Sequence, residues 1–304
     1  MVTFLQLNTI FLSMIMEAIP FILLGVIVSG LIQTFLSERW IARVMPRNRY
    51  AASLLGCGVG LLFPACECGI VPITRRLLKK GVPLHAGIAF MLTGPIINPI
   101  VLFATYIAFG NDWHMVLVRG GAAIVVAYVT AIILSFLYPK LPMRLHEDAM
   151  PEIAAGADAS MTAVSRIPMH RRLYDVMLHA IDEFFSVGKY LVLGAFIAAS
   201  MQTFIPTSSL MKLGGNPVTA SLVMIVLAFV MSLCSEADAF IASSFRSTFS
   251  IGALSAFLVF GPMIDIKNTL MLLGVFRGRF VLVLIGLVVA STLGVSLLVG
   301  RLFG

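Results

Sequence analysis

Eight apolar segments, each close to the length of a membrane span, limit what this chain can fold into. They fall near residues 4–32, 51–71, 85–109, 117–138, 184–205, 217–235, 249–266 and 280–300. A transmembrane helix needs about 20 consecutive apolar residues. Charged residues make up only 12% of the chain, against about 25% in a soluble domain. The sequence therefore predicts an all-α polytopic membrane protein.

Several partners and activities are disfavoured by the same composition. The net charge of +7 reports which loops face the cytoplasm rather than a nucleic-acid partner, and none is expected. The four cysteines lie in apolar segments, which argues against an extracellular disulfide framework. No Walker-type phosphate loop is present, so ATP hydrolysis by that route is not expected, and no cofactor is predicted. The apolar amino terminus lacks the basic region of a signal peptide and is interpreted as a retained first span.

The long polar stretch at residues 139–180 divides the chain into two halves of four segments. We predict a first membrane repeat at 1–138, a polar cytoplasmic linker at 139–180 and a second membrane repeat at 181–304. Matching residues recur at an offset of 169 or, after a two-residue deletion, 167. The pairs are Leu24-Gly25 with Leu193-Gly194, Gln33-Thr34-Phe35 with Gln202-Thr203-Phe204, Glu67 with Glu236, Gly94-Pro95 with Gly261-Pro262, and Asn98 with Asp265.

The basic residues bear on how many segments cross. If all eight cross, the loops on the two sides carry 11 and 8 Lys and Arg. If 51–71 and 217–235 are re-entrant instead, 15 of these Lys and Arg residues lie on one side and 4 on the other. The 15 lie in 33–50, 72–84 and 139–180 and at Arg277 and Arg279. The 4 are Arg119, Lys212, Arg246 and Arg301. The positive-inside rule favours the re-entrant arrangement. Three crossings per half would make the repeats inverted.

The motif Phe63-Pro64-Ala65-Cys66-Glu67-Cys68-Gly69-Ile70-Val71-Pro72 places a carboxylate between two thiols in an apolar segment. An ionisable residue inside a membrane costs roughly 2.5–3.5 kcal/mol on insertion scales and indicates a functional site. The prolines and glycine predict a break with extended backbone, on which Cys66 and Cys68 share a side. With Glu67 they would form a soft metal site. For Cys57 and Cys234 a packing role is favoured.

Three further breaks bring polar residues into apolar segments. Gly94-Pro95-Ile96-Ile97-Asn98-Pro99 leaves carbonyls without donors beside the Asn98 amide, and Gly261-Pro262-Met263-Ile264-Asp265 repeats this break with a carboxylate. Asp265 and Lys267 are expected either to form an ion pair or to serve function. A third break contains Glu236 and Asp238, whose proximity should raise their affinity for protons. Alternating Gly56, Gly58 and Gly60 indicate close helix packing.

Asp175, His179 and Glu183 would share one face of a helix at 171–185. They could bind a metal ion, but a solvated face of an amphipathic helix is the favoured interpretation.

With CECGIVPITRRLLKKGVP, TGPIINP, SEADAF and GPMID, the chain resembles a bacterial family of predicted permeases that includes ArsP-type organoarsenical efflux permeases and YraQ-like and YcgR-like proteins. The resemblance covers about 10–138 and 180–300. It implies a multi-pass permease of the bacterial plasma (inner) membrane, in some members paired with a second subunit and suspected of handling metals. By motif, the family's thiols fall on Cys66 and Cys68, its acid on Glu67 and its polar break on Asn98.

We therefore expect a secondary permease that exports a thiophilic metal ion or a trivalent arsenical, coupled to protons. Its central site would be lined by Cys66, Glu67, Cys68, Asn98, Glu236, Asp238 and Asp265. The expected partners are the lipid bilayer, the small inorganic or organometalloid substrate and a second permease subunit, and a homo-oligomer is an open alternative. The alternative functions are a membrane thiol-disulfide enzyme using Cys66 and Cys68, which an apolar setting disfavours, and the membrane subunit of a two-component permease with another substrate.

Overall fold

The computed structural model describes residues 2–35, 41, 43–46, 48–61, 66–139, 142–143, 169–204 and 216–303. Within these ranges the chain forms helices joined by turns, with one isolated antiparallel bridge between Met143 and Phe276. Six helical stretches are long and apolar enough to cross a membrane. They are Phe4–Ile32, Leu84–Ala108, Trp113–Leu137, Ala180–Phe204, Ile251–Val275 and Gly278–Phe303. The predicted all-helical, multi-pass class is confirmed.

The helices follow one another in a similar order in the two halves. The first half contains α1 (Val2–Phe35), α3 (Arg49–Gly60), α4 (Glu67–Lys79), α5 (Leu84–Ile97), α6 (Pro99–Ala108) and α7 (Trp113–Leu137). The second half contains α8 (Met169–Phe204), α10 (Pro217–Met231), α11 (Ser235–Ser244), α12 (Ile251–Met263), α13 (Ile266–Val275) and α14 (Gly278–Phe303). Because α8 begins at Met169, residues 169–180 of the expected linker are helical.

The predicted segments 51–71 and 217–235 are the two that lack a single long helix. The first is divided between α3, which ends at Gly60, and α4, which begins at Glu67. The second contains α10, of 15 residues, which ends where Ser232 adopts the left-handed conformation with φ 46°. A non-glycine residue in that region cannot continue a right-handed helix. Both segments are therefore too short, as single helices, to cross.

Two spans are broken in the middle by local backbone chemistry. Asn98 takes an extended ψ of 133° between α5 and α6, because Pro99 disfavours the helical conformation for the residue before it. The Asn98 side chain then accepts a hydrogen bond from the Ile100 amide at 2.9 Å and caps α6. Asp265 separates α12 from α13 and accepts a hydrogen bond from the Asn268 amide at 2.6 Å.

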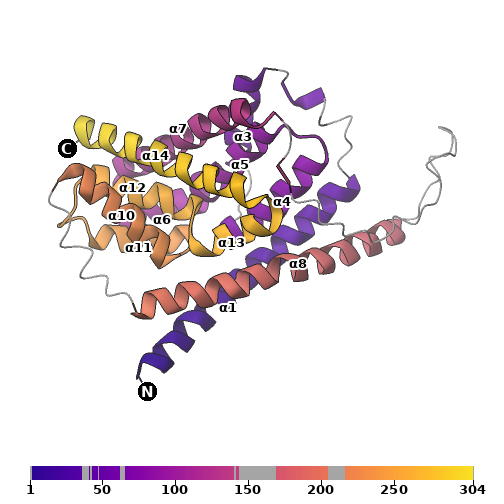
Figure 1. The fold of residues 1–304 in the computed structure, drawn as a ribbon, viewed down its shortest axis with the longest axis horizontal. Coiled ribbons are helices and arrows are strands. Elements are labelled where there is room, and N and C mark those ends of the chain that lie inside the picture. The colour runs from indigo at the N-terminus through magenta and orange to yellow at the C-terminus, as the bar shows by residue number, and fades with distance from the viewer. Residues whose placement is uncertain are drawn as a thin grey trace.

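The broken spans lie in the middle of the bundle. The long helices α1 and α8 pack side by side along one flank, and α7 and α14 lie across the opposite flank (Figure 1). Helices α5 and α12 contact each other between them. The broken spans α5–α6 and α12–α13 have 78% and 83% of their apolar windows buried, against 28–39% for the other four spans. The two breaks are thus shielded from lipid.

Candidate substrate site at the helix breaks

The Cys-Glu-Cys motif forms the start of α4. Cys66 is the N-cap, with extended φ −76° and ψ 175°, and Glu67 is the first helical residue. The prediction that both cysteines lie on extended backbone is wrong for Cys68, which belongs to the first turn. Pro72 lies inside α4, where it removes only the hydrogen bond to the Cys68 carbonyl instead of ending the helix. The thiols of Cys66 and Cys68 nevertheless lie close enough to interact with each other.

Glu67 is buried, with 2% of its surface exposed, and its negative charge is compensated by a lysine in the other half of the chain. Its Oε1 lies 3.8 Å from Lys267 Nζ, and its Oε2 accepts a hydrogen bond from Ser235 Oγ at 3.4 Å. Lys267 Nζ also lies 3.7 Å from Asp265 Oδ2. The ion pair considered for Asp265 and Lys267 is therefore present, and Glu67 shares the lysine. One cation balances two carboxylates here.

Asp265 is further held by neighbours in the second half. Its Oδ2 accepts a hydrogen bond from Ser232 Oγ at 2.6 Å, and its Oδ1 accepts one from the Asn268 backbone amide in the first turn of α13. The Asn268 side chain in turn donates to the Met263 carbonyl at 2.8 Å, across the break. These bonds satisfy a carboxylate that would otherwise be costly at this depth.

Arg119 is a second buried cation that the sequence reasoning placed in a loop. It is fully buried, because α7 begins at Trp113 and places it nearly two turns, at about 3.6 residues each, inside the helix. Its Nη1 donates to Thr105 Oγ1 at 2.6 Å and its Nη2 to the Ser235 carbonyl at 2.8 Å. The apolar run Met115–Val118 before it was the signal that it lies inside a span.

These contacts join into one buried polar chain through the centre of the bundle. It runs in order through Thr105, Arg119, Ser235, Glu67, Lys267 and Asp265, and Asp265 accepts hydrogen bonds from both Ser232 and Asn268. Every member is at most 5% exposed. The chain starts on α6 and α7, passes the first residue of α11 and the first residue of α4, and ends at α13. Both halves of the protein therefore contribute to it.

The remaining predicted site residues occupy three different settings. Asn98 is buried and caps α6, and among the described residues it has no hydrogen bond to the buried polar chain. Asp238 is 2% exposed, and its Oδ2 has no hydrogen-bond partner among the described residues. Glu236 is half-buried. The structure thus brings Glu67 and Asp265 together through Lys267 and leaves Asn98 in a capping role.

Glu17 is not among the residues that the sequence predicted for the site. Its side chain is exposed on α1 and lies close enough to act on Cys234 and Glu236. The available signal was a single carboxylate inside the apolar segment 4–32. Glu17 extends the polar region outward from the start of α11.

Metal ligation has limited support. Among the described residues, no three His, Cys, Asp or Glu side chains are placed to hold a metal ion together. The Glu67 carboxylate contacts Lys267 and Ser235 instead of joining the two thiols. A two-sulphur site at Cys66 and Cys68 is what the geometry offers to a soft ligand.

Glu183 corrects the favoured interpretation of the helix at 171–185. It is buried, it lies 3.0 Å from Arg76 Nε on α4, and it accepts a hydrogen bond from Ser29 Oγ on α1 at 2.7 Å. A solvated face is therefore wrong for Glu183, because α1 and α4 cover it. The side chains of Asp175 and His179 lie outside the described residues.

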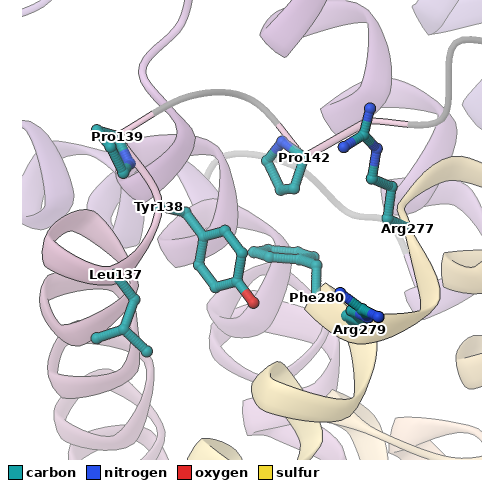
Figure 2. Close-up of a pocket in the computed structure, with 7 residues that line it drawn as sticks. All are labelled: Leu137, Tyr138, Pro139, Pro142, Arg277, Arg279 and Phe280. Atoms are coloured by element: carbon teal, nitrogen blue, oxygen red, sulfur yellow. The ribbon is translucent and has the colours of Figure 1, made fainter.

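A cavity of about 410 Å³ lies away from this site, where α7 ends and α14 begins. Figure 2 shows the side chains that line it: Leu137, Tyr138, Pro139, Pro142, Arg277, Arg279 and Phe280. The Tyr138 and Phe280 rings meet edge to face, with centroids 5.1 Å apart. None of the predicted site residues lines this cavity.

Polar and charged groups gathered at helix breaks inside an apolar bundle define the class of multi-pass helical membrane protein to which transporters belong. Over residues 3–301 the chain matches a family described as "predicted permease", and it belongs to that family. The resemblance seen in the sequence motifs is therefore confirmed.

Three relatives illustrate the range of this similarity. The chain is 59% identical over 297 residues to UPF0718 protein YcgR of Bacillus subtilis, covering 98% of each chain. It is 46% identical over 282 residues, 93% of this chain and 91% of the other, to a putative two-component membrane permease complex subunit of Streptococcus mutans. UPF0718 protein YraQ of Escherichia coli is 27% identical over 135 residues, 44% of this chain and 38% of its own. No solved structure matches the chain.

Proposed function

We propose that the protein is a secondary permease that moves a small solute through a central site in the plasma membrane. The observation that carries this proposal is the buried polar chain, which places two cations and two carboxylates in the middle of an apolar bundle. Ionisable groups at such a depth are costly and mark substrate or ion pathways. Membership of a predicted permease family supports the same activity.

Alternating access between two inverted repeats is the mechanism we propose. It is supported by the matching order of elements, with three candidate spans in each half. An odd number of crossings would insert the second half upside down relative to the first. The helix starts favour a register one residue different from the sequence alignment, because Cys66 and Cys234 are the N-caps of α4 and α11. In this register Glu67 corresponds to Ser235, its hydrogen-bond donor.

The repeats would be oriented with the linker in the cytoplasm. In this arrangement α3–α4 and α10–α11 are re-entrant pairs that enter and leave on the same side. Support comes from the basic residues, 15 against 4, and the burial of Arg119 removes it from the smaller group. The remaining asymmetry strengthens the positive-inside argument.

The substrate we propose is a thiophilic metal ion or trivalent arsenical held by the thiols of Cys66 and Cys68. Support comes from the proximity of these thiols at the start of α4 and from the preference of soft ions for sulphur. Glu67 would serve as a third ligand only after leaving Lys267. Export is the proposed direction.

Transport by purified protein in liposomes tests this function. The probes are Zn²⁺, Cd²⁺, Cu⁺ and a trivalent methylated arsenical, each with an imposed proton gradient. Wild type should move at least one of them, Lys267→Gln should abolish this movement, and Lys267→Arg should retain part of it because the charge remains. The matched control is Lys189→Gln, since Lys189 also lies in an apolar segment but has an exposed side chain. Failure to move any probe, or full transport by Lys267→Gln, would contradict the proposal.

A second permease subunit is the partner that we propose. The support is the Streptococcus mutans relative, whose name describes a subunit of a two-component membrane permease complex. Affinity purification of the tagged protein in mild detergent from its own membranes should recover one other integral membrane protein in equal amount. Recovery of this chain alone, in active form, would exclude an obligate partner.

A further inference from the structure

Buried charges near the centre of the protein do not balance. Among the described residues around the buried polar chain, the fully buried carboxylates are Glu67, Asp238 and Asp265, whereas the buried cations are Arg119 and Lys267. An isolated charge in an apolar interior is so unfavourable that such a group is usually neutral or paired. One of these three carboxylates therefore lacks a counter-charge.

Hydrogen bonding identifies Asp238 as the uncompensated group. Glu67 and Asp265 share Lys267 and accept hydrogen bonds from Ser235 and Ser232. Asp238 Oδ2 has no hydrogen-bond partner among the described residues. It lies against the backbone of Gly261 on α12, where an added Cβ would be only 2.9 Å away. This oxygen therefore faces an apolar wall.

The charged groups that face Asp238 come from three helices. Arg119 on α7 acts on it most strongly among the charged groups, and Glu67 on α4 and Asp265 and Lys267 at the start of α13 act more weakly. Helices α6 and α12, which pack against α11, contain no charged residue. Glu236 lies on the same helix as Asp238 and is half-buried.

One hydrogen-bond donor of Arg119 is unpaired among the described residues. Its Nη1 and Nη2 are occupied by Thr105 and the Ser235 carbonyl, whereas its Nε is buried without a hydrogen-bond partner among the described residues. No ion pair joins it to Asp238 in this part of the structure at 4.0 Å or less. An unpaired buried donor and an unpaired buried acceptor on neighbouring helices are each costly on their own.

We propose that Asp238 is the binding site of a coupling proton and that it carries this proton in the conformation seen here. The protonated carboxyl is neutral, which removes the excess charge and accounts for the oxygen that faces Gly261. When Asp238 releases the proton to water, the carboxylate that forms is compensated by Arg119. The site is distinct from the thiols of Cys66 and Cys68, which take the substrate.

A physical connection links the two sites, and this step rests on the proposed permease function. Arg119 donates to the Ser235 carbonyl, and the Ser235 hydroxyl donates to Glu67, next to both cysteines. If Arg119 turns toward an ionised Asp238, it weakens its hold on the first residue of α11. Loss of the proton is thereby coupled to the position of Ser235 and Glu67.

Infrared spectroscopy of the purified protein tests the proton without any transport measurement. A protonated carboxylic acid has a carbonyl stretch that is well separated from that of a carboxylate and shifts in D₂O. Wild type at neutral pH should show this band, Asp238→Asn should lose it, and Asp238→Glu should show it at a shifted frequency. Glu236→Gln is the matched control, from the same helix, and should retain the band. Each variant is first checked for a monodisperse, helical state.

Several outcomes would overturn the proposal. Absence of the band from wild type at neutral pH would mean that Asp238 is ionised. If Na⁺, but not K⁺, then raised the thermal stability of the protein, the ligand of Asp238 would be a metal cation instead of a proton. A band that survives in Asp238→Asn and disappears in Glu67→Gln would move the proton to Glu67. Because the band is read without transport, its absence leaves the permease proposal standing. If transport fails while the band is present, the protonation of Asp238 stands and its coupling to transport is refuted.

Discussion

Cys66 and Cys68 differ from the other two cysteines by their proximity to each other at the start of α4. We predict that Cys66→Ser and Cys68→Ser each weaken binding of a soft substrate by at least about tenfold, because a hydroxyl is a poor ligand for such ions. The double variant should be scarcely worse than either single variant, since two sulphurs that act as one chelate are non-additive. Binding is measured with the same panel of ions and arsenicals used for transport.

Cys57→Ser supplies the control, because Cys57 on α3 is a free cysteine that is as buried as Cys68. It should bind like wild type, apart from a small loss of packing. Undiminished binding by the Cys66/Cys68 double variant, at matched membrane expression, would refute the soft site and direct attention to the carboxylates.

How far single residues could be predicted depends on where their partners lie. The cost of Glu67 inside a membrane follows from its apolar surroundings and requires no structure. Its partner Lys267 belongs to the other half of the chain, and no local pattern specifies that contact. Arg119 was misplaced because its helix begins earlier than the hydrophobic window, and helix ends are where sequence patterns are least informative.

Close contact between helix backbones is the main feature at the level of single elements. The prediction that Gly56, Gly58 and Gly60 serve close packing is confirmed for two of them. A Cβ on Gly56 would collide with the Ala86 carbonyl on α5, and one on Gly60 would lie 3.0 Å from Gly94. Nothing lies within 4 Å of a Cβ on Gly58.

Gly56 and Gly58 lie within one turn of α3 but differ in the space around them, so alanine substitutions at the two positions should have different effects on stability. Gly56→Ala should destabilise the protein by about 1–3 kcal/mol, because the α5 backbone has to move away. Gly58→Ala should be neutral or stabilise it by up to about 1 kcal/mol, through a better helix propensity. Thermal unfolding in detergent, followed by circular dichroism, compares the two. Equal destabilisation by both substitutions would show that α3 and α5 are not in backbone contact.

The breaks between elements were easier to predict than their geometry. Proline and glycine located the interruptions near Asn98 and Asp265, because both residue types act on the local backbone. The same residue types predicted a non-helical segment around Cys68 that is longer than the observed one, since Pro72 is accommodated inside α4. Whether a proline ends a helix depends on which carbonyl loses its hydrogen-bond donor. That carbonyl can be identified only when the residue at which the helix begins is known.

The arrangement of the whole chain across the membrane has a direct test. We predict that single cysteines at Val44 and Lys79 are labelled from the cytoplasmic side and that one at Trp113 is labelled from the opposite side. The prediction rests on α3 and α4 entering and leaving on one side. Val44 and Trp113 are 44% and 63% exposed, and Lys79 is exposed. Membrane-impermeant maleimide on cells and inverted vesicles, in a variant whose four native cysteines are replaced, makes the measurement.

Labelling of Val44→Cys and Lys79→Cys from opposite sides would instead require 51–71 to cross and the repeats to be parallel. Six of the eight predicted segments coincide with candidate spans, because span length and apolar composition are local properties. Which spans lie in the centre did not follow from hydropathy, since all six are apolar and only packing distinguishes the shielded pair.

Glu67 and its partner Lys267 are synthesised at different times. The lysine emerges from the ribosome 200 residues after the glutamate, roughly ten to forty seconds later at about 5–20 residues per second. During that interval the nascent first half holds an intramembrane carboxylate without its cation. The carboxylate must then keep its proton or remain beside the insertion machinery until the second half arrives. Biogenesis of this protein is therefore completed by its last third, and a chain truncated before Lys267 is a natural target for membrane quality control.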